Sequence, residues 1–330
     1  MSDSQETPYS SLGPELILQA VESLDIPCDG RLLALNSYEN RVYQVGVDEA
    51  TPIIAKFYRP GRWSDAAILE EHHYSQSLMS AEIPVVAPLV RSSCTLHTFS
   101  GYRFALFPRQ GGRWPELDSL NNLAWLGRFM GRIHRHAGSV QFEHRPTLSI
   151  ESFGEASLSY LLGRDDLIPG YLMDNYQAIV EMLLARIRIC FEQLGPLRQL
   201  RLHGDCHPGN ILWTDQGPHF VDFDDCRMGP AIQDLWMLLS GDRNDQERQL
   251  TALIDGYNEF NEFDPSELNL VEPLRALRMI HYAAWLARRW VDPAFKQNFP
   301  WFAGARYWEE HLQALREQLA LLDEPALRLL

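Results

Sequence analysis

The hydrophobic pattern of this 330-residue chain changes near residue 110, and no other sequence feature limits the possible folds as strongly. Before that point, short β-rich runs are separated by turn-forming residues, which predicts an antiparallel sheet. After it, apolar residues recur at helical spacing over long stretches. The segment PRQGGRWPE at 108–116 interrupts both patterns, so we place a hinge there. The chain is therefore expected to form an α+β, two-lobed fold, with an N-lobe at residues 1–108 and a C-lobe at residues 109–330.

The predicted N-lobe combines a small antiparallel sheet with one main helix. That helix covers residues 64–79, where Ser64 and Asp65 can cap the first turn. A shorter helix is expected at residues 14–24, after a polar N-terminal segment. The strands are expected at residues 32–35, 41–47, 52–58 and 98–108.

The predicted C-lobe is larger and mostly helical. Residues 200–212 and 219–223 are the exception, because short apolar runs there flank clusters of His, Asp and Asn. Such runs are typical of strands that carry polar groups into a loop. The helices are expected at residues 120–135, 171–193, 231–239, 246–259, 268–290 and 305–322.

The composition is that of a folded globular protein, since 45% of residues are hydrophobic, 22% are charged and nine are tryptophan. A net charge of −15 without a dense Lys/Arg tract argues against nucleic acid and anionic membranes as partners. The five cysteines are scattered, with no CxxC pair, and are expected to be reduced thiols. The first eleven residues lack the features of a secretion signal. We therefore expect a cytoplasmic protein, and we expect it to act as a monomer.

Three polar residues of the C-lobe carry the predicted chemistry. The segment HGDCHPGN at 203–210 places Asp205 and Asn210 five residues apart in a turn-rich loop, and Asp222 follows in VDFDD at 221–225. Transfer of a phosphoryl group from ATP needs a base for the attacking hydroxyl and oxygen ligands for magnesium. In this interpretation Asp205 is the catalytic base, and Asn210 and Asp222 hold Mg²⁺. The arrangement parallels the HRDxxxxN loop and the metal-binding aspartate of protein kinases.

A transition-metal site is an alternative for the same segment, because His203, Asp205 and His207 alternate as HxDxH. This alternative explains neither Asn210 nor the VDFDD run. We expect His203 instead to be a buried, hydrogen-bonded residue that shapes the loop.

The N-lobe offers residues that a bound nucleotide would need. Lys56 projects from an apolar run, PIIAKFY, and can pair with the α- and β-phosphates of ATP. Glu70 or Glu71 on the following helix can fix its ammonium group, and we favour Glu71. Residues 36–43, NSYENRVY, lie where a phosphate-covering loop is expected but contain no GxGxxG, so backbone amides, the Ser37 hydroxyl and the Asn side chains would contact phosphate. A plain hairpin turn is the alternative for this segment.

With these residues assembled, the chain resembles the aminoglycoside phosphotransferase and choline kinase branch of the protein-kinase-like superfamily. The resemblance implies a two-lobed protein-kinase-like fold, Mg²⁺-dependent use of ATP, phosphorylation of Ser and Thr hydroxyls in proteins, autophosphorylation and a role in bacterial stress responses. It also implies that Asp205 is the base, that Asn210 and Asp222 bind magnesium, with Asp222 an active-site residue too, and that Ser37 and Lys56 contact ATP. Besides HGDCHPGN and DFD, the phrases that carry the resemblance are LNSYENRVYQV, AKFYRP, ILEEH, GPAIQDLWMLL, EPLRALR and NFPWF.

The sequence departs from typical protein kinases after VDFDD. No APE-type activation segment follows, so regulation by phosphorylation of such a segment is not expected. Instead GPAIQD leads toward the next predicted helix, and Asp234 is expected to cap that helix or to brace the catalytic loop.

Two other functions remain open. A kinase for a small alcohol would share the catalytic residues and would need a carboxylate- or aromatic-lined pocket, to which Asp224, Asp225, Trp285 and Trp290 could contribute. A pseudokinase scaffold is the third possibility. The complete set of catalytic and nucleotide residues argues against the scaffold.

Overall fold

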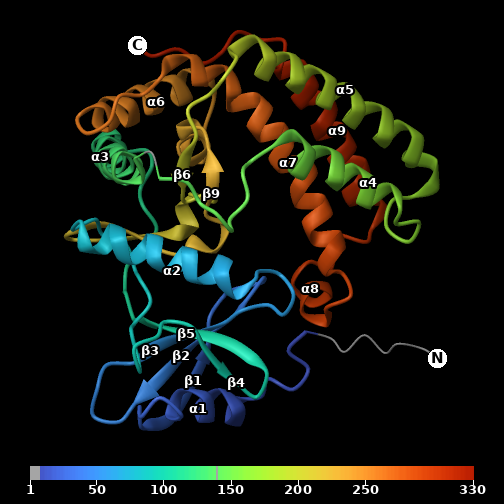
Figure 1. The fold of residues 1–330 in the computed structure, drawn as a ribbon. Helices are drawn as coiled ribbons and strands as arrows, with labels where there is room; N and C mark the ends of the chain where they lie inside the picture. Colours follow the sequence, from blue (N-terminus) through green and yellow to red (C-terminus); the bar gives the residue numbers. More distant parts are fainter. Residues whose placement is uncertain (1–7, 139) are drawn as a thin grey trace.

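A computed structural model describes residues 8–138 and 140–330 of the chain. Its N-lobe is a five-stranded antiparallel sheet in the order β1-β2-β3-β5-β4. Helix α2 lies between this sheet and the helical part, whereas α1 covers the far side of the sheet (Figure 1). The predicted sheet and its main helix are confirmed. The N-lobe elements are α1 (Pro14–Glu22), β1 (Cys28–Ala34), β2 (Arg41–Val47), β3 (Ile53–Phe57), α2 (Asp65–Ser80), β4 (His97–Phe99) and β5 (Tyr102–Pro108).

Local sequence explains where these elements begin and end. The Ser64 hydroxyl accepts the backbone N–H of Ala67 at 3.1 Å, which caps α2 as predicted. The single strand predicted at 98–108 is wrong, because the chain turns within it and forms two paired strands, β4 and β5. Ser100 and Gly101 make this turn with φ values of 47° and 83°, and glycine adopts the second of these without a steric penalty.

The C-lobe consists of packed helices around a short-stranded centre. Helices α3 and α6 cross closely, and a Cβ on Gly127 or Gly256 would lie 1.9 or 2.0 Å from a carbonyl oxygen of the facing helix, so only glycine fits. The C-lobe helices are α3 (Leu120–Ala137), α4 (Ala156–Leu162), α5 (Gly170–Leu194), α6 (Arg243–Asn258), α7 (Val271–Arg289), α8 (Pro293–Asn298) and α9 (Ala305–Leu321).

Two strand pairs at the centre of the C-lobe present its polar loops. Strand β6 (Leu200–Leu202) pairs with β9 (Arg227–Gly229), and β7 (Ile211–Thr214) pairs with β8 (Gly217–Phe220). The HGDCHPGN segment connects β6 to β7, and the VDFDD segment connects β8 to β9. The two predicted polar segments are thus brought side by side. Strand β9 and helices α4 and α8 were not predicted.

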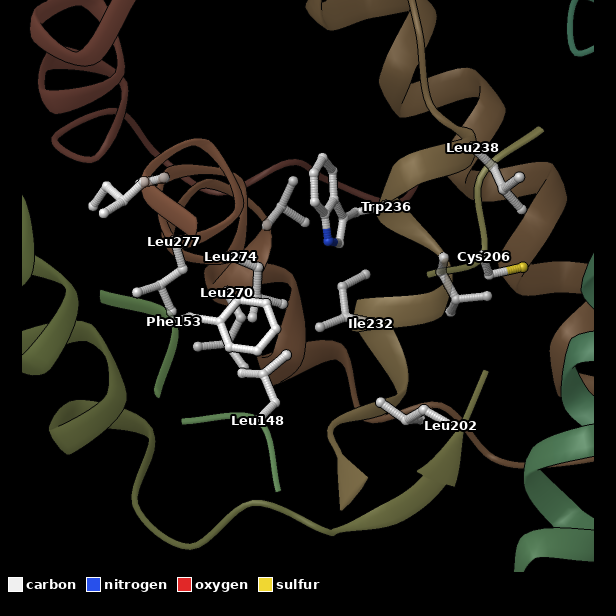
Figure 2. Packing of buried hydrophobic residues seen from close by; sticks show 14 of the residues in the cluster. Leu148, Phe153, Leu202, Cys206, Ile232, Trp236, Leu238, Leu270, Leu274 and Leu277 are labelled. Carbon is white, nitrogen blue, oxygen red and sulfur yellow. The ribbon is translucent and has the colours of Figure 1, made fainter. Parts of the chain in front are cut away.

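The helix predicted at residues 231–239 is wrong. The chain there forms two short 3₁₀ turns, Ala231–Asp234 and Trp236–Leu238. Figure 2 shows Ile232 and Trp236 turned toward Leu270 and Leu274 in the buried core around α7. Tertiary contacts therefore override the local helical periodicity, because both the apolar side chains and the polar Asp234 have fixed partners on different sides of the segment.

Residues 1–7, part of the polar N-terminal segment on which the predicted location partly depends, lie outside the described residues. Within residues 8–138 and 140–330, no helix is both long enough and apolar enough to span a bilayer.

Candidate active site

The loop of residues 203–210, which we call the catalytic loop after its predicted role, is held in place by Asp234. The Asp234 carboxylate accepts the backbone N–H groups of His203 at 2.7 Å and Gly204 at 2.8 Å, and it lies 3.2 Å from Nε2 of His134 on α3. Burial raises the pKa of Asp234, but the hydrogen bond and charge of His134, together with the backbone donors, outweigh burial and lower that pKa. Of its two predicted roles, Asp234 therefore braces the catalytic loop.

Two unusual backbone conformations shape the site. Gly204 has a φ of 86°, and a Cβ there would lie 2.1 Å from the carbonyl oxygen of Asp225, so no larger residue fits. Asp222 has a φ of 61°, in the left-handed region that few residues other than glycine adopt. This strain is of the kind found where a side chain must be held in one direction.

His203 links the two polar loops. Its Nε2 lies 2.9 Å from the backbone oxygen of Val221, and its ring is fully buried 4.5 Å from that of Phe223. The prediction of a buried histidine that shapes the loop is confirmed. The HxDxH alternative is wrong, because this nitrogen is committed to the backbone and no group of His, Cys, Asp or Glu within the described ranges is arranged to hold a metal ion.

Lys56 is buried against three carboxylates. Its Nζ lies 2.9 Å from Asp222, 3.3 Å from Asp224 and 3.4 Å from Glu71. Burial alone would lower the pKa of Lys56, but these three negative charges outweigh burial and hold the pKa well above its ordinary value. The ammonium group is therefore a fixed positive charge at the junction of strand β3, helix α2 and the VDFDD segment.

The two adjacent glutamates of α2 have different partners. Glu71 is buried and contacts both Lys56 and the guanidinium of Arg145, the latter at 2.7 Å. Glu70 instead accepts three backbone N–H groups of residues 143–145. Of the two glutamates, Glu71, the favoured candidate, is therefore the one that contacts Lys56.

The carboxylates of the VDFDD segment are neutralised by arginines. Arg62 contacts both Asp224 and Asp225, and Arg227 lies 2.8 Å from Asp225. Arginines thus neutralise both of the aspartates that were considered for a pocket that binds a cationic substrate. They belong to what we call the ion-pair network, whose carboxylates are Glu39, Glu71, Asp222, Asp224, Asp225 and Asp292 and whose cations are Arg41, Lys56, Arg59, Arg62, Arg145, Arg227 and Arg289.

The segment predicted to cover the phosphates is anchored to the C-lobe through this network. The Glu39 carboxylate accepts Nε1–H of Trp285 at 2.6 Å and lies 3.0 Å from Nη2 of Arg289, both on α7. Asp292, just before α8, lies 2.8 Å from Arg59 of the N-lobe. Figure 1 shows α8 beside the N-lobe, so the lobes meet there through side chains as well as through the chain that joins β5 to α3. Trp285, which was considered for a substrate pocket, thus anchors this segment to α7.

A cavity of about 300 Å³ lies between the sheet and the catalytic loop. Its apolar part includes Val42, Ile54 and Leu212, which suits a planar base. The predicted site residues Ser37, Lys56, Glu71, Asn210 and Asp222 all line the cavity, whereas Asp205 does not.

The polar end of this cavity fits Mg²⁺ and nucleotide phosphates. The side chain of Asn210 donates its Nδ2–H to the backbone oxygen of Asp205 at 3.0 Å, and no donor in the described chain occupies its amide oxygen. The Asp222 side chain is 48% exposed despite its contact with Lys56. Two oxygen donors beside a lysine suit magnesium, which in kinase sites is commonly bound by one or two protein ligands plus phosphate oxygens.

Asp205 lies outside this cavity, where the catalytic loop meets α7. Its Oδ1 is 2.6 Å from Nη1 of Arg278 on α7, and its Oδ2 is 3.6 Å from Nε2 of His207. Burial lowers the pKa of His207, so the arginine is the cation at this carboxylate. Arg278 was not predicted, although it belongs to the phrase EPLRALR, which was noted without a role.

This arrangement agrees with the comparison to known families. A family described as "phosphotransferase enzyme family" matches residues 31–271. The chain belongs to this family. Stress response kinase A of Escherichia coli O157:H7 is 44% identical over 97% of both chains, and a serine/threonine protein kinase, RdoA, of Salmonella typhimurium is 44% identical over 100% of this chain and 99% of its own.

A solved structure of this family's fold has the same two-lobed arrangement. Amicoumacin kinase hAmiN, solved with AMP-PNP and Ca²⁺, superposes with a TM-score of 0.70 at 19% identity, over 90% of this chain and 91% of its own. The predicted protein-kinase-like fold is therefore confirmed. At this level of identity the superposition supports the fold and not the substrate.

Proposed function

We propose that this chain is an ATP- and Mg²⁺-dependent serine/threonine protein kinase that also phosphorylates itself and acts in a bacterial stress response. The observation that carries the proposal is the 2.9 Å contact of Lys56 with Asp222, which joins an N-lobe strand to the predicted metal-binding loop at one cavity. Full-length similarity to chains named as stress response and serine/threonine kinases supports a protein acceptor.

The chain's own residues would divide the work between the two sides of the catalytic loop. Lys56 and Ser37 would contact ATP phosphates, with Glu71 holding the lysine in place. Asn210 and Asp222 would hold magnesium, which when bound neutralises charge on the phosphates. Asp205 would orient the acceptor hydroxyl and receive its proton. We also propose a cytoplasmic monomer, in keeping with the acidic composition.

A small-molecule kinase is the second candidate, because the structural neighbour hAmiN is named as a kinase of amicoumacin and not of a protein. Incubation with labelled ATP and magnesium separates the possibilities. We expect label on the chain itself and on a generic protein substrate. Label only on a member of a panel of small alcohols would favour the second candidate, and ATP binding without turnover would indicate a scaffold.

A further inference from the structure

Asp205, which would meet the acceptor hydroxyl, marks what we call the acceptor side of the catalytic loop. The arginine beside it, Arg278, has N–H groups that are free to donate further hydrogen bonds. Arg278 projects from α7 and uses Nη1 to contact Asp205 at 2.6 Å. A guanidinium group has five N–H donors, and the described residues provide no acceptor for the other four. The Arg278 side chain is 38% exposed, so a ligand can reach it.

The carboxylates of the ion-pair network are not available to bind a positively charged acceptor. Every carboxylate of the ion-pair network lies within 4.0 Å of at least one arginine or lysine, and its seven cations outnumber its six carboxylates. The network thus carries an excess positive charge within a chain of net charge −15. Asp205 itself is already paired with Arg278.

A hydroxyl that reaches Asp205 must therefore arrive beside a guanidinium group. An ammonium group next to that hydroxyl would be repelled. A carboxylate or phosphate in the same place could accept two parallel N–H bonds from the guanidinium, the strongest common form of this contact.

We propose that Arg278 determines the specificity of the acceptor site by binding an anionic group next to the hydroxyl that is phosphorylated. The favoured acceptor is a Ser or Thr flanked by acidic residues in a protein. A small alcohol that carries a phosphate offers the same chemistry. This inference rests on the proposed phosphotransferase function and names the class of its substrate.

The test compares matched acceptors on the full chain. Two peptides differ only in having Glu or Lys beside one Ser, and two small alcohols, glycerol phosphate and choline, differ in the sign of their charge. For each enzyme the ratio of kcat/KM between the two peptides is measured. We expect the wild type to favour the Glu peptide by about tenfold or more, and Arg278→Gln to reduce this preference to about twofold or less.

Arg275→Gln is the matched control, because Arg275 lies one turn earlier on α7 and pairs with Glu272 instead of Asp205. It should keep the preference of the wild type. Labelling of glycerol phosphate but of neither peptide would still support an anionic acceptor, and it would show that this acceptor is a small molecule and not a protein. Preference of the wild type for the Lys peptide or for choline would overturn the inference, as would an unchanged preference in Arg278→Gln.

A binding measurement separates this inference from the kinase proposal. Fluorescent versions of the two peptides, with Ala in place of Ser, are titrated into the wild type and into Arg278→Gln. Selective binding of the Glu peptide that Arg278→Gln loses, without any phosphoryl transfer, would support the anion site and reject the kinase. Transfer that occurs without selectivity in either assay would support the kinase and reject the anion site.

Discussion

Charged groups are arranged differently on the two sides of the catalytic loop. On the side that we propose binds the nucleotide, Lys56 and Glu71 are buried, and each contacts more than one opposite charge. On the side that we propose binds the acceptor, Asp205 and Arg278 are partly exposed and contact each other through one short pair. Because an unpaired charge is costly only where water is excluded, the nucleotide side must be completed by the fold itself. The acceptor side can leave donors free for a substrate.

The largest expected effect is a loss of activity alone, caused by a substitution on the acceptor side. Asp205→Asn keeps the shape of the side chain but cannot take a proton, so phosphoryl transfer should fall by about 10³-fold, or about 4 kcal/mol in barrier. Because Asp205 lies outside the ion-pair network, nucleotide binding and the melting temperature should change little. Labelled-phosphate transfer, nucleotide titration and thermal unfolding measure the three quantities. Near wild-type transfer would remove Asp205 from the role of base.

On the nucleotide side, the corresponding change should affect stability. Glu71→Gln leaves Lys56 and Arg145 with one fewer negative charge in a buried site, and we expect a loss of about 3 kcal/mol in the free energy of unfolding. Chemical denaturation measures this loss. Glu259→Gln, which breaks an exposed pair with Arg128, is the control and should leave the midpoint unchanged. Equal denaturation midpoints for the two variants would mean that burial does not determine how much stability is lost when a charge is removed.

Glu267 shows how burial changes the pKa of a carboxylate that no cation of the described chain contacts. It accepts the backbone N–H of Ile232 at 2.9 Å, and no arginine, lysine or histidine in the part of the chain that the structure describes forms an ion pair with it. Burial raises its pKa to about 7 from an ordinary value of 4.5. The folded state therefore binds more protons than the unfolded state between these values, so stability should fall as pH rises from about 4.5 to 7.

Glu267→Gln removes this titration. The variant should match the wild type near pH 4.5 and exceed it above pH 7, by up to about 3 kcal/mol if the full shift is expressed. Denaturation at a series of pH values provides the measurement. A variant less stable than the wild type at pH 8 would contradict the assigned direction of the shift.

The smallest effect is expected where the network reaches the phosphate-covering segment. Glu39→Gln weakens the contacts with Arg289 and Arg59, so Ser37 should be held less firmly over the phosphates. We expect KM for ATP to rise by about tenfold, with a smaller change in kcat. Steady-state kinetics at varied ATP concentration would show this, and the rise should be smaller at high salt if charge holds the segment, because screening already weakens these contacts in the wild type. A fall in kcat with an unchanged KM for ATP would contradict this role of Glu39 in positioning Ser37.

Much of the fold and site could be predicted because the relevant signals are local. The Ser64 cap lies beside the helix that it starts, and the spacing of Asp205 and Asn210 is set within one loop. The segment at 231–239 shows the limit of such signals. Its apolar periodicity favours a helix, but Asp234 is drawn to the backbone of residues 203–204, about thirty positions earlier.

The two-part α+β architecture, the polar loop at 203–210 and the candidate residues for nucleotide and metal could all be predicted from the amino-acid sequence. Which glutamate contacts Lys56, the neutralisation of Asp224 and Asp225, and the cation beside Asp205 became visible in the folded chain. Arg278 is 73 residues from Asp205, and Arg289 is 250 residues from Glu39. The physical reason is that hydrophobic periodicity and loop spacing act over a few residues, whereas charges pair with whatever the folded chain brings within 4 Å.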